Sequence, residues 1–266
     1  MAAFANSGVV WDSITKNGKF EDFNLQVARG QITNHSSVNI LAYGTTPATA
    51  GLFRTIWENM ATTDYVFPAS ALTMQLVSTA AGDTATITIN GLDANYNIIT
   101  ENVALNGTTN VPTVNQYLRV NSIFVSIGSS TNPTGVITLS NGGVVYAQIS
   151  TVTIGGSTTS TGISQAAIYT VPAGYSLYGM RYSAYSSFNG NSANYTTYRA
   201  VTNTNLGVQR VVVQTPFNTN YEIVRQIPFF YAEKTDLRFQ IASSAASAAV
   251  TGANIGFMLI ANASSF

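Results

Sequence analysis

Side chains that could carry out catalysis are few and scattered in this 266-residue chain. The only histidine is His35, and no cysteine is present, so disulfides, thiolate metal sites and cysteine nucleophiles are excluded. A lone histidine without a G-x-S-x-G serine turn does not make a Ser-His-Asp triad. We therefore predict no catalytic residue and interpret His35 as a solvated or interface side chain.

One segment partly matches a calcium-binding loop. The run Asp93-Ala94-Asn95-Tyr96-Asn97 has the first three ligand positions of an EF-hand. The match then ends, because Ile98 stands where the loop needs glycine and Ala104 where it needs a bidentate glutamate. We interpret the run as an Asx-rich turn between two strands, and predict no metal site and no cofactor.

Glycoside hydrolysis would need two carboxylates flanking a cleft. Glu101 and Asp83 lie near predicted strand ends, but nothing in the sequence distinguishes them from ordinary surface carboxylates. An enzyme acting on a surface polysaccharide therefore remains only a third alternative, and we predict that the chain is not an enzyme.

Tyrosines gather in the C-terminal part of the chain, near Asn189, Asn191 and Asn194. Aromatic faces stack on sugars, so the group is a candidate glycan platform. The same residue types also fill protein cores and interfaces between chains. The candidate glycan-binding or interface cluster consists of Tyr178, Tyr182, Tyr185, Tyr195 and Tyr198.

The composition indicates association more than chemistry. Hydrophobic residues make up 45% of the chain and charged residues only 8%, with 11 basic and 11 acidic side chains. A chain this poor in charge is expected to spend part of its surface against other chains. Because no basic patch stands out, we predict no nucleic-acid partner. No apolar run is long enough for a membrane helix, and we predict no membrane partner.

The elements that must position these residues are β-strands. Residues 1–45 are predicted to be an extended N-terminal arm, in which Phe23, Leu25 and Val27 alternate and Val38 and Ile40 follow. Such an arm either lends a strand to a neighbour or lies on its own domain. Both alternatives stay open.

Residues 46–150 are predicted to form a β-sandwich domain. Short runs of period two end at turn signals such as Asn90-Gly91, Asn106-Gly107 and Asn141-Gly142-Gly143. Several short strands at this spacing are typical of a sandwich. The segment Leu52–Met60 has helical spacing and competes with an edge strand over Arg54–Glu58, and the sequence does not choose between them.

Residues 151–165 are rich in Gly, Ser and Thr and carry no charge, so we predict a linker or mobile loop. Residues 166–266 then hold about eight strands, which predicts a C-terminal jelly-roll domain. The strand near Thr251–Ala261 is apolar on both faces and should be central or at an interface. The predicted fold class is all-β: arm, β-sandwich and jelly roll.

Charge is divided unevenly along the chain. Residues 1–150 hold five basic and eight acidic side chains (5 − 8 = −3), and the rest holds six and three (6 − 3 = +3). This split would suit complementary patches on neighbouring copies. Five arginines lie on predicted C-terminal strands: Arg181, Arg199, Arg210, Arg225 and Arg238. Paired with Glu222, Glu233 or Asp236, they would form rim or subunit-interface contacts.

Several motifs resemble virion structural proteins of tailed phages, particularly phages of marine bacteria and cyanophage-type viruses. The resemblance covers about residues 50–260 and rests on turn and strand signatures. These are Gly91-Leu92-Asp93-Ala94-Asn95-Tyr96-Asn97, Leu105-Asn106-Gly107, Tyr117-Leu118-Arg119-Val120, the YTVPAG run at 169–174, Pro216-Phe217 and Glu233-Lys234-Thr235-Asp236. It implies an all-β particle component and carries no catalytic residues.

We therefore expect a bacteriophage virion structural protein, foremost a capsid decoration or cement protein. It would act as a homo-oligomer, expected to be a trimer, and bind the major capsid protein or tail components. The alternative is a tail-fibre or baseplate protein that recognises a cell-surface glycan. The start of the chain lacks the pattern of a secretory signal, so we expect synthesis in the host cytoplasm and residence in the virion.

Overall fold

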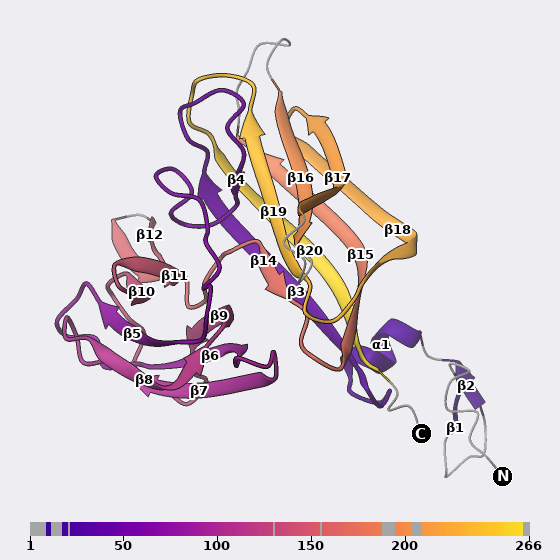
Figure 1. The fold of residues 1–266 in the computed structure, drawn as a ribbon, viewed down its shortest axis with the longest axis horizontal. Coiled ribbons are helices and arrows are strands. Elements are labelled where there is room, and N and C mark those ends of the chain that lie inside the picture. The colour runs from indigo at the N-terminus through magenta and orange to yellow at the C-terminus, as the bar shows by residue number, and fades with distance from the viewer. Residues whose placement is uncertain are drawn as a thin grey trace.

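The protein consists of two β-sandwiches, the smaller inserted into the larger (Figure 1). The computed structural model describes residues 9–11, 18–20, 22–129, 131–154, 156–187, 195–203 and 209–262. Each sandwich has its own buried apolar cluster. The chain is all-β apart from one short helix among the described residues.

The larger sandwich is a jelly roll made of two antiparallel sheets. The first sheet contains, in spatial order, β18 (Asn220–Tyr231), β15 (Tyr175–Ser186), β20 (Val250–Ala261) and β3 (His35–Thr45). The second contains β14 (Ile168–Thr170), β19 (Asp236–Ser243), β16 (Thr196–Asn203) and β17 (Gln209–Phe217), and β4 (Arg54–Thr55) adds to β19.

The pairing of these strands is nested. Apart from β4, the first strand in the chain pairs with the last, the second with the seventh, the third with the sixth and the fourth with the fifth. A long antiparallel ribbon folded over itself gives this order, which is a double Greek key. The C-terminal strand β20 lies between β15 and β3, so the prediction that it is central is confirmed.

The smaller sandwich is inserted between β4 and β14. One sheet contains β11 (Val144–Ile149), β10 (Ile137–Asn141), β5 (Leu72–Ser78) and β8 (Val111–Tyr117). The other contains β7 (Ile98–Ala104), β6 (Thr86–Leu92) and β9 (Arg119–Val125). Alternate residues of both sheets, such as Leu76, Ile87 and Leu139, fill its core.

The strand pairing differs from the predicted limits of the arm. Residues 35–45 form β3, whose eleven residues pair with β20 inside the jelly roll. Ile40 and Ala42 of β3 belong to the jelly-roll core. The predicted arm boundary at residue 45 is therefore wrong. The partner strand of residues 35–45 lies about 200 residues further along the chain, and local sequence patterns carry no information about so distant a partner.

Residues 23–28 also differ from the predicted alternation, because they form the helix α1 (Phe23–Ala28). The Asp22 carboxylate accepts hydrogen bonds from the backbone N–H groups of Asn24 (2.9 Å) and Leu25 (3.2 Å). This N-cap satisfies two donors that a helix start leaves free. Figure 1 shows α1 at one end of β3, with the two-stranded hairpin of β1 (Val9–Trp11) and β2 (Gly18–Phe20) beyond it.

Three further local predictions are settled by the strands. Leu52–Met60 contains no helix: only Arg54–Thr55 is strand, and Ile56, Trp57 and Met60 are buried in the jelly-roll core. The predicted linker contains a two-stranded hairpin, β12 (Thr151–Ile154) and β13 (Ser157–Ser160). Asn141-Gly142-Gly143 is the predicted hairpin turn, with both glycines at positive φ.

Asn90-Gly91 was predicted to end a strand, and that prediction is wrong. Both residues lie inside β6, and the chain turns instead at residues 93–97. Gly91 is needed for close packing, since a Cβ there would collide with the Arg119 carbonyl and the Tyr117 ring. Glycine inside a strand commonly marks such an approach.

Candidate functional site

The junction between the two sandwiches is held by a buried ion pair. The Arg119 guanidinium on β9 donates from Nε and Nη2 to the two oxygens of Asp236 on β19, at 2.7 and 2.8 Å. Both side chains are buried, with relative exposures of 8% and 6%. Planar, bidentate pairs of this kind are the strongest arginine–carboxylate contacts.

Further polar contacts complete this pair. Arg119 Nη1 donates to the carbonyls of Pro68 and Leu118, and the Thr170 hydroxyl donates to Asp236 Oδ1 at 2.6 Å. Burial alone would lower the pKa of Arg119, but the hydrogen bonds and charge of Asp236 outweigh it and raise that pKa. Arg119 therefore stays a cation that links the two sandwiches.

An amide side chain covers the short edge strand β14 nearby. Asn121 on β9 accepts from the Thr170 N–H at 3.0 Å and donates to the Thr170 carbonyl at 3.3 Å. The Asn121 side chain thus makes the two backbone hydrogen bonds that a neighbouring strand would make with Thr170. The Ala173 N–H also donates to the Tyr96 carbonyl, so the 93–97 turn rests on the loop that follows β14.

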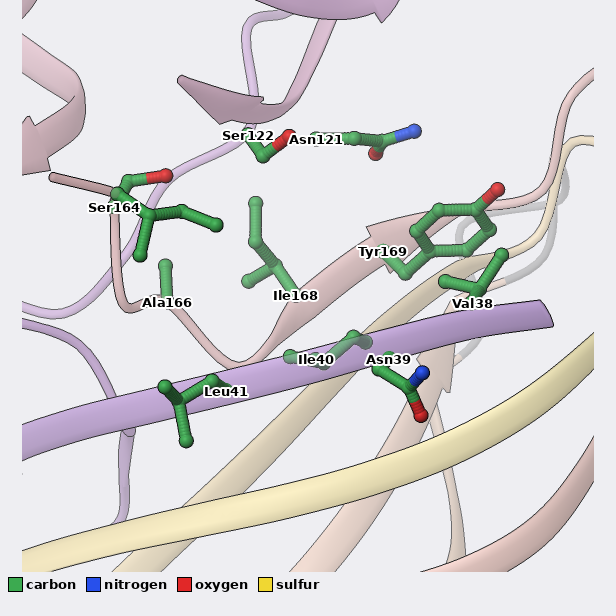
Figure 2. A pocket seen from close by; sticks show the side chains of 11 residues that line it. Val38, Asn39, Ile40, Leu41, Asn121, Ser122, Ser164, Ala166, Ile168 and Tyr169 are labelled. Carbon is green, nitrogen blue, oxygen red and sulfur yellow. The ribbon is translucent and has the colours of Figure 1, made fainter. Parts of the chain in front are cut away.

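A groove runs along this junction, between β3 on one side and β9 and β14 on the other. At one end is a cavity of about 110 Å³, whose lining includes Val38, Ile40, Ile163 and Ile168. It continues into a wider hollow of about 460 Å³. Figure 2 shows Val38 and Ile40 of β3 pointing toward Ile168 and Tyr169, while Asn39 and Leu41 point the other way.

The groove contains no charged side chain among the residues that line it. Its polar groups are amides and hydroxyls, including Asn39, Asn90, Ser122 and Tyr169. Pockets at domain junctions are the usual place for ligands. This lining suits a neutral ligand or an uncharged polypeptide segment.

The five tyrosines of the candidate cluster do not come together. Tyr182 and Tyr198 have no exposed surface and lie in the jelly-roll core. The Tyr182 and Tyr231 hydroxyls share a hydrogen bond of 3.0 Å, and burial raises the pKa of both Tyr182 and Tyr198. Neither core tyrosine can reach a glycan. Tyr195 is 47% exposed and immediately precedes β16.

Tyr178 and Tyr185 lie on the outer face of the β18–β15–β20–β3 sheet. Strand register places Tyr178 beside Phe230 and Met258, and Tyr185 beside Gly252 and, one strand further, Tyr43. We define this outer face by residues at the same register rows. Its apolar and charged members are Leu41, Tyr43, Tyr178, Arg181, Tyr185, Glu222, Val224, Phe230 and Met258, and the same rows also hold the polar residues Asn39, Ser183, Asn220 and Asn254.

The outer face exposes several large apolar side chains among polar ones. Val224 and Phe230 are 68% and 60% exposed, and Leu41 is 49% exposed. The only charged groups defined on it are Arg181 and Glu222, which pair with each other at 2.9 Å. The sequence analysis named Glu222 among possible partners of the C-terminal arginines at a rim or subunit interface, whereas this pair lies within one chain. A neutral, aromatic-rich face has the composition of a protein interface.

The remaining candidate residues serve the fold. Glu101 on β7 accepts from the N–H groups of Val114 and Asn115 on β8, which joins the edges of the two small sheets. Asp83 accepts from Ser78, Thr134 and Gly135. Burial would raise the pKa of Asp83, but these hydrogen bonds lower it overall.

The calcium-like run is the predicted Asx turn between β6 and β7. The Asp93 carboxylate accepts from the backbone N–H of Asn95 (2.7 Å) and of Asn97 (2.9 Å). The backbone of its own loop therefore occupies the Asp93 carboxylate. Across the described residues, no group of three or more metal-binding side chains comes together. His35 begins β3, with Nδ1 at 2.9 Å from the Thr33 carbonyl.

Sequence reasoning missed the pairing of Arg119 with Asp236, which are 117 residues apart. One signal was present: Arg119 interrupts an apolar strand sequence, Leu118-Arg119-Val120. It also missed Glu58, whose Oε1 accepts from the Gln165 N–H while Oε2 is buried without a partner. No described helix has the length and apolarity needed to span a membrane.

No family model and no curated protein matches the sequence. Among solved structures, T=1 particles derived from infectious bursal virus match with 12% identity and a TM-score of 0.25, over 86% of this chain and 70% of that one. The T13 particle of infectious bursal disease virus matches with 11% identity and a TM-score of 0.19, over 85% and 72%. Likenesses this weak carry no argument about function.

Proposed function

We propose that the protein is a structural component of a bacteriophage virion and that it serves as a decoration, or cement, protein of the head. In this role it binds copies of itself, as a trimer, and the major capsid protein. It carries out no catalysis. It is made in the host cytoplasm and resides in the particle.

The observation that carries this proposal is the outer face of the β18–β15–β20–β3 sheet. A monomer does not gain from leaving an apolar face of this kind in water, since burial contributes about 25 cal/mol per Å² before the costs of association. The charge-poor composition and the phage resemblance of the sequence point to the same role.

The alternative, a fibre or baseplate protein that grips a glycan, depended on the tyrosine cluster. Tyr182 and Tyr198 lie in the core, so the cluster does not form a platform. No other observation on the molecule favours that alternative over the first.

Substitution on the outer face tests the self-association. Val224→Lys places a charge on this face, and we expect it to weaken association at least about tenfold because a lysine resists desolvation. Val114→Lys is the matched control, since Val114 is 90% exposed on the other sandwich. Sedimentation equilibrium measures the association constant. Equal association by both variants would contradict this assignment of the interface.

Imaging of particles tests the role itself. Electron micrographs of phage made without this protein should lack one layer on the head, and those heads should break at lower temperature. Complete heads, tails and fibres in its absence would exclude a place in the virion.

A further inference from the structure

The outer edge of β3 is the one long jelly-roll edge without protection. Proteins block exposed edges with proline or charge because unpaired backbone groups attract another strand. Edge strand β17 carries Pro216 and edge strand β18 carries Pro228. The eleven residues of β3, HSSVNILAYGT, contain neither proline nor a charged Lys, Arg, Asp or Glu.

At the other two strands that border the groove, β14 and β9, backbone groups on the outer edge already form hydrogen bonds. Asn121 pairs with both backbone groups of Thr170 on β14. The outer edge of β9 bonds to residues 162–164, through Val125 N–H to Gly162 and Ser164 N–H to Ile123. These bonds leave β3 as the longest strand edge that borders the groove.

The direction of the β3 backbone groups follows from a single contact. The Tyr43 N–H donates outward to the Gln165 carbonyl at 3.2 Å. Backbone groups of an antiparallel strand alternate between its two sides, so Ser37, Asn39 and Leu41 also direct theirs outward. No hydrogen bond from these three to another backbone segment is recorded in the described part of the chain.

We propose that residues 2–8 of a second copy bind in this groove as an added strand on β3, with Phe4 in the 110 Å³ cavity. This rests on the self-association in the proposed function and names its site and its partner segment. Strand addition uses main-chain hydrogen bonds for affinity and side-chain pockets for specificity.

The segment matches the groove in charge and length. Residues 2–8, AAFANSG, have no charged side chain, and neither does the lining of the groove. Seven extended residues span about 23 Å, and the five residues from Ser37 to Leu41 span roughly 16 Å. Phe4 is the only aromatic residue among the seven, and an aromatic ring suits a cavity edged by Ile163 and Ile168.

The position of the N-terminal hairpin favours a second copy over the same chain. Figure 1 places β1 and β2 beyond α1, on the side of the jelly roll away from the small sandwich. The groove lies where the small sandwich meets β3. β1, which begins at Val9, therefore lies away from the groove of its own chain.

A peptide of residues 2–8 tests the site directly on a chain that lacks those residues. Native-state hydrogen exchange should slow at least about tenfold at the amides of Ser37, Asn39 and Leu41 when the peptide binds. The matched peptide with Phe4→Ala should bind at least about tenfold more weakly, because it leaves the cavity empty. No protection at these amides would overturn the proposal.

Two variants at one position test the backbone pairing. Asn39→Pro removes an outward N–H but no bond to β20, whereas Asn39→Ala keeps the N–H and removes only the side chain. Peptide binding should be lost in the first and kept in the second, with melting temperatures confirming that both fold. Equal binding by both would overturn the strand addition, and the exchange experiment decides independently if Asn39→Pro does not fold.

The full chain separates the remaining alternatives. A chain that is monomeric at all concentrations but protected at Asn39 would place the segment in its own groove and overturn the second copy. Particles that hold a normal amount of the chain lacking residues 2–8 would overturn this inference and leave the virion role intact. Particles that never contain the protein would overturn that role instead.

Discussion

At the scale of single residues, carboxylates in this protein act as acceptors for its own backbone. Asp93 closes a turn, Glu101 ties β7 to β8 and Asp83 anchors the loop at Thr134. An ionised carboxylate accepting two or three hydrogen bonds is held firmly in one position. These residues are therefore occupied by the fold and are not free for a substrate.

Glu58 also accepts a backbone N–H, but its second oxygen is buried without a partner, and its titration should be visible in the stability of the protein. Burial raises the pKa of Glu58 from 4.5 to about 8, against the lowering effect of the Gln165 N–H. A raised pKa means that the folded state binds the proton more tightly than the unfolded state. The stability that protonated Glu58 contributes to the folded state is therefore complete below about pH 4.5 and is lost as the pH rises to about 8.

We expect the free energy of unfolding to fall by as much as about 1.4 kcal/mol per pH unit between pH 5 and 7 on this account. Glu58→Gln removes the titrating group and should flatten that slope. Urea unfolding at several pH values measures both proteins. Asp83 has a lowered pKa and acts only on the acid side of 3.8, outside this window. Identical slopes in the two proteins would show that Glu58 is solvated.

At the scale of elements, proline marks the edges. Pro112, Pro216 and Pro228 are the prolines inside strands, and they lie on β8, β17 and β18, each at the end of its sheet. Proline cannot donate to a ladder, so central strands exclude it. The positions of these prolines agree with the rule, and β3 is the long jelly-roll edge strand that has none.

The bulge in β15 depends on a glycine. The register shifts between Gly179 and Arg181, and the Tyr182 hydroxyl occupies the space that a Cβ on residue 179 would need. Tyr182 cannot yield easily, because its ring is fully buried and bonded to Tyr231.

Gly179→Ala should therefore destabilise the protein by about 1–3 kcal/mol, the usual cost of overpacking a core. Gly256→Ala is the matched control in the neighbouring strand, where the nearest atoms to a new Cβ are 3.6 and 3.7 Å away. We expect it to change stability by less than about 0.5 kcal/mol. Chemical unfolding compares the two, and equal stabilities would contradict the packing argument.

At the scale of the whole molecule, the two sandwiches are joined by polar contacts more than by a shared core. Arg119 and Asp236 link the two sandwiches, and the fully buried members of each apolar cluster belong to one sandwich. A buried pair adds modestly to stability when intact, but loss of one partner leaves an uncompensated charge.

Asp236→Asn should cost about 3 kcal/mol, because Arg119 then stays buried without a counter-charge. Glu222→Gln disrupts the exposed pair with Arg181 and should cost less than about 1 kcal/mol. Unfolding free energies measure both, and the Thr170 amide, bonded to Asn121, should exchange faster only in the first variant. A small and equal cost in both would indicate that water reaches the junction.

The sequence by itself determined the fold class, the hairpin at Asn141-Gly142-Gly143, the C-terminal jelly-roll strands and the absence of any complete catalytic motif. These follow from periodicity and turn chemistry, which act between near neighbours. Only the tertiary structure decided that residues 35–45 complete the jelly roll, that Tyr182 and Tyr198 are core residues, and that Arg119 meets Asp236. Those facts depend on contacts between segments more than twenty residues apart, and no local pattern specifies which strands will meet.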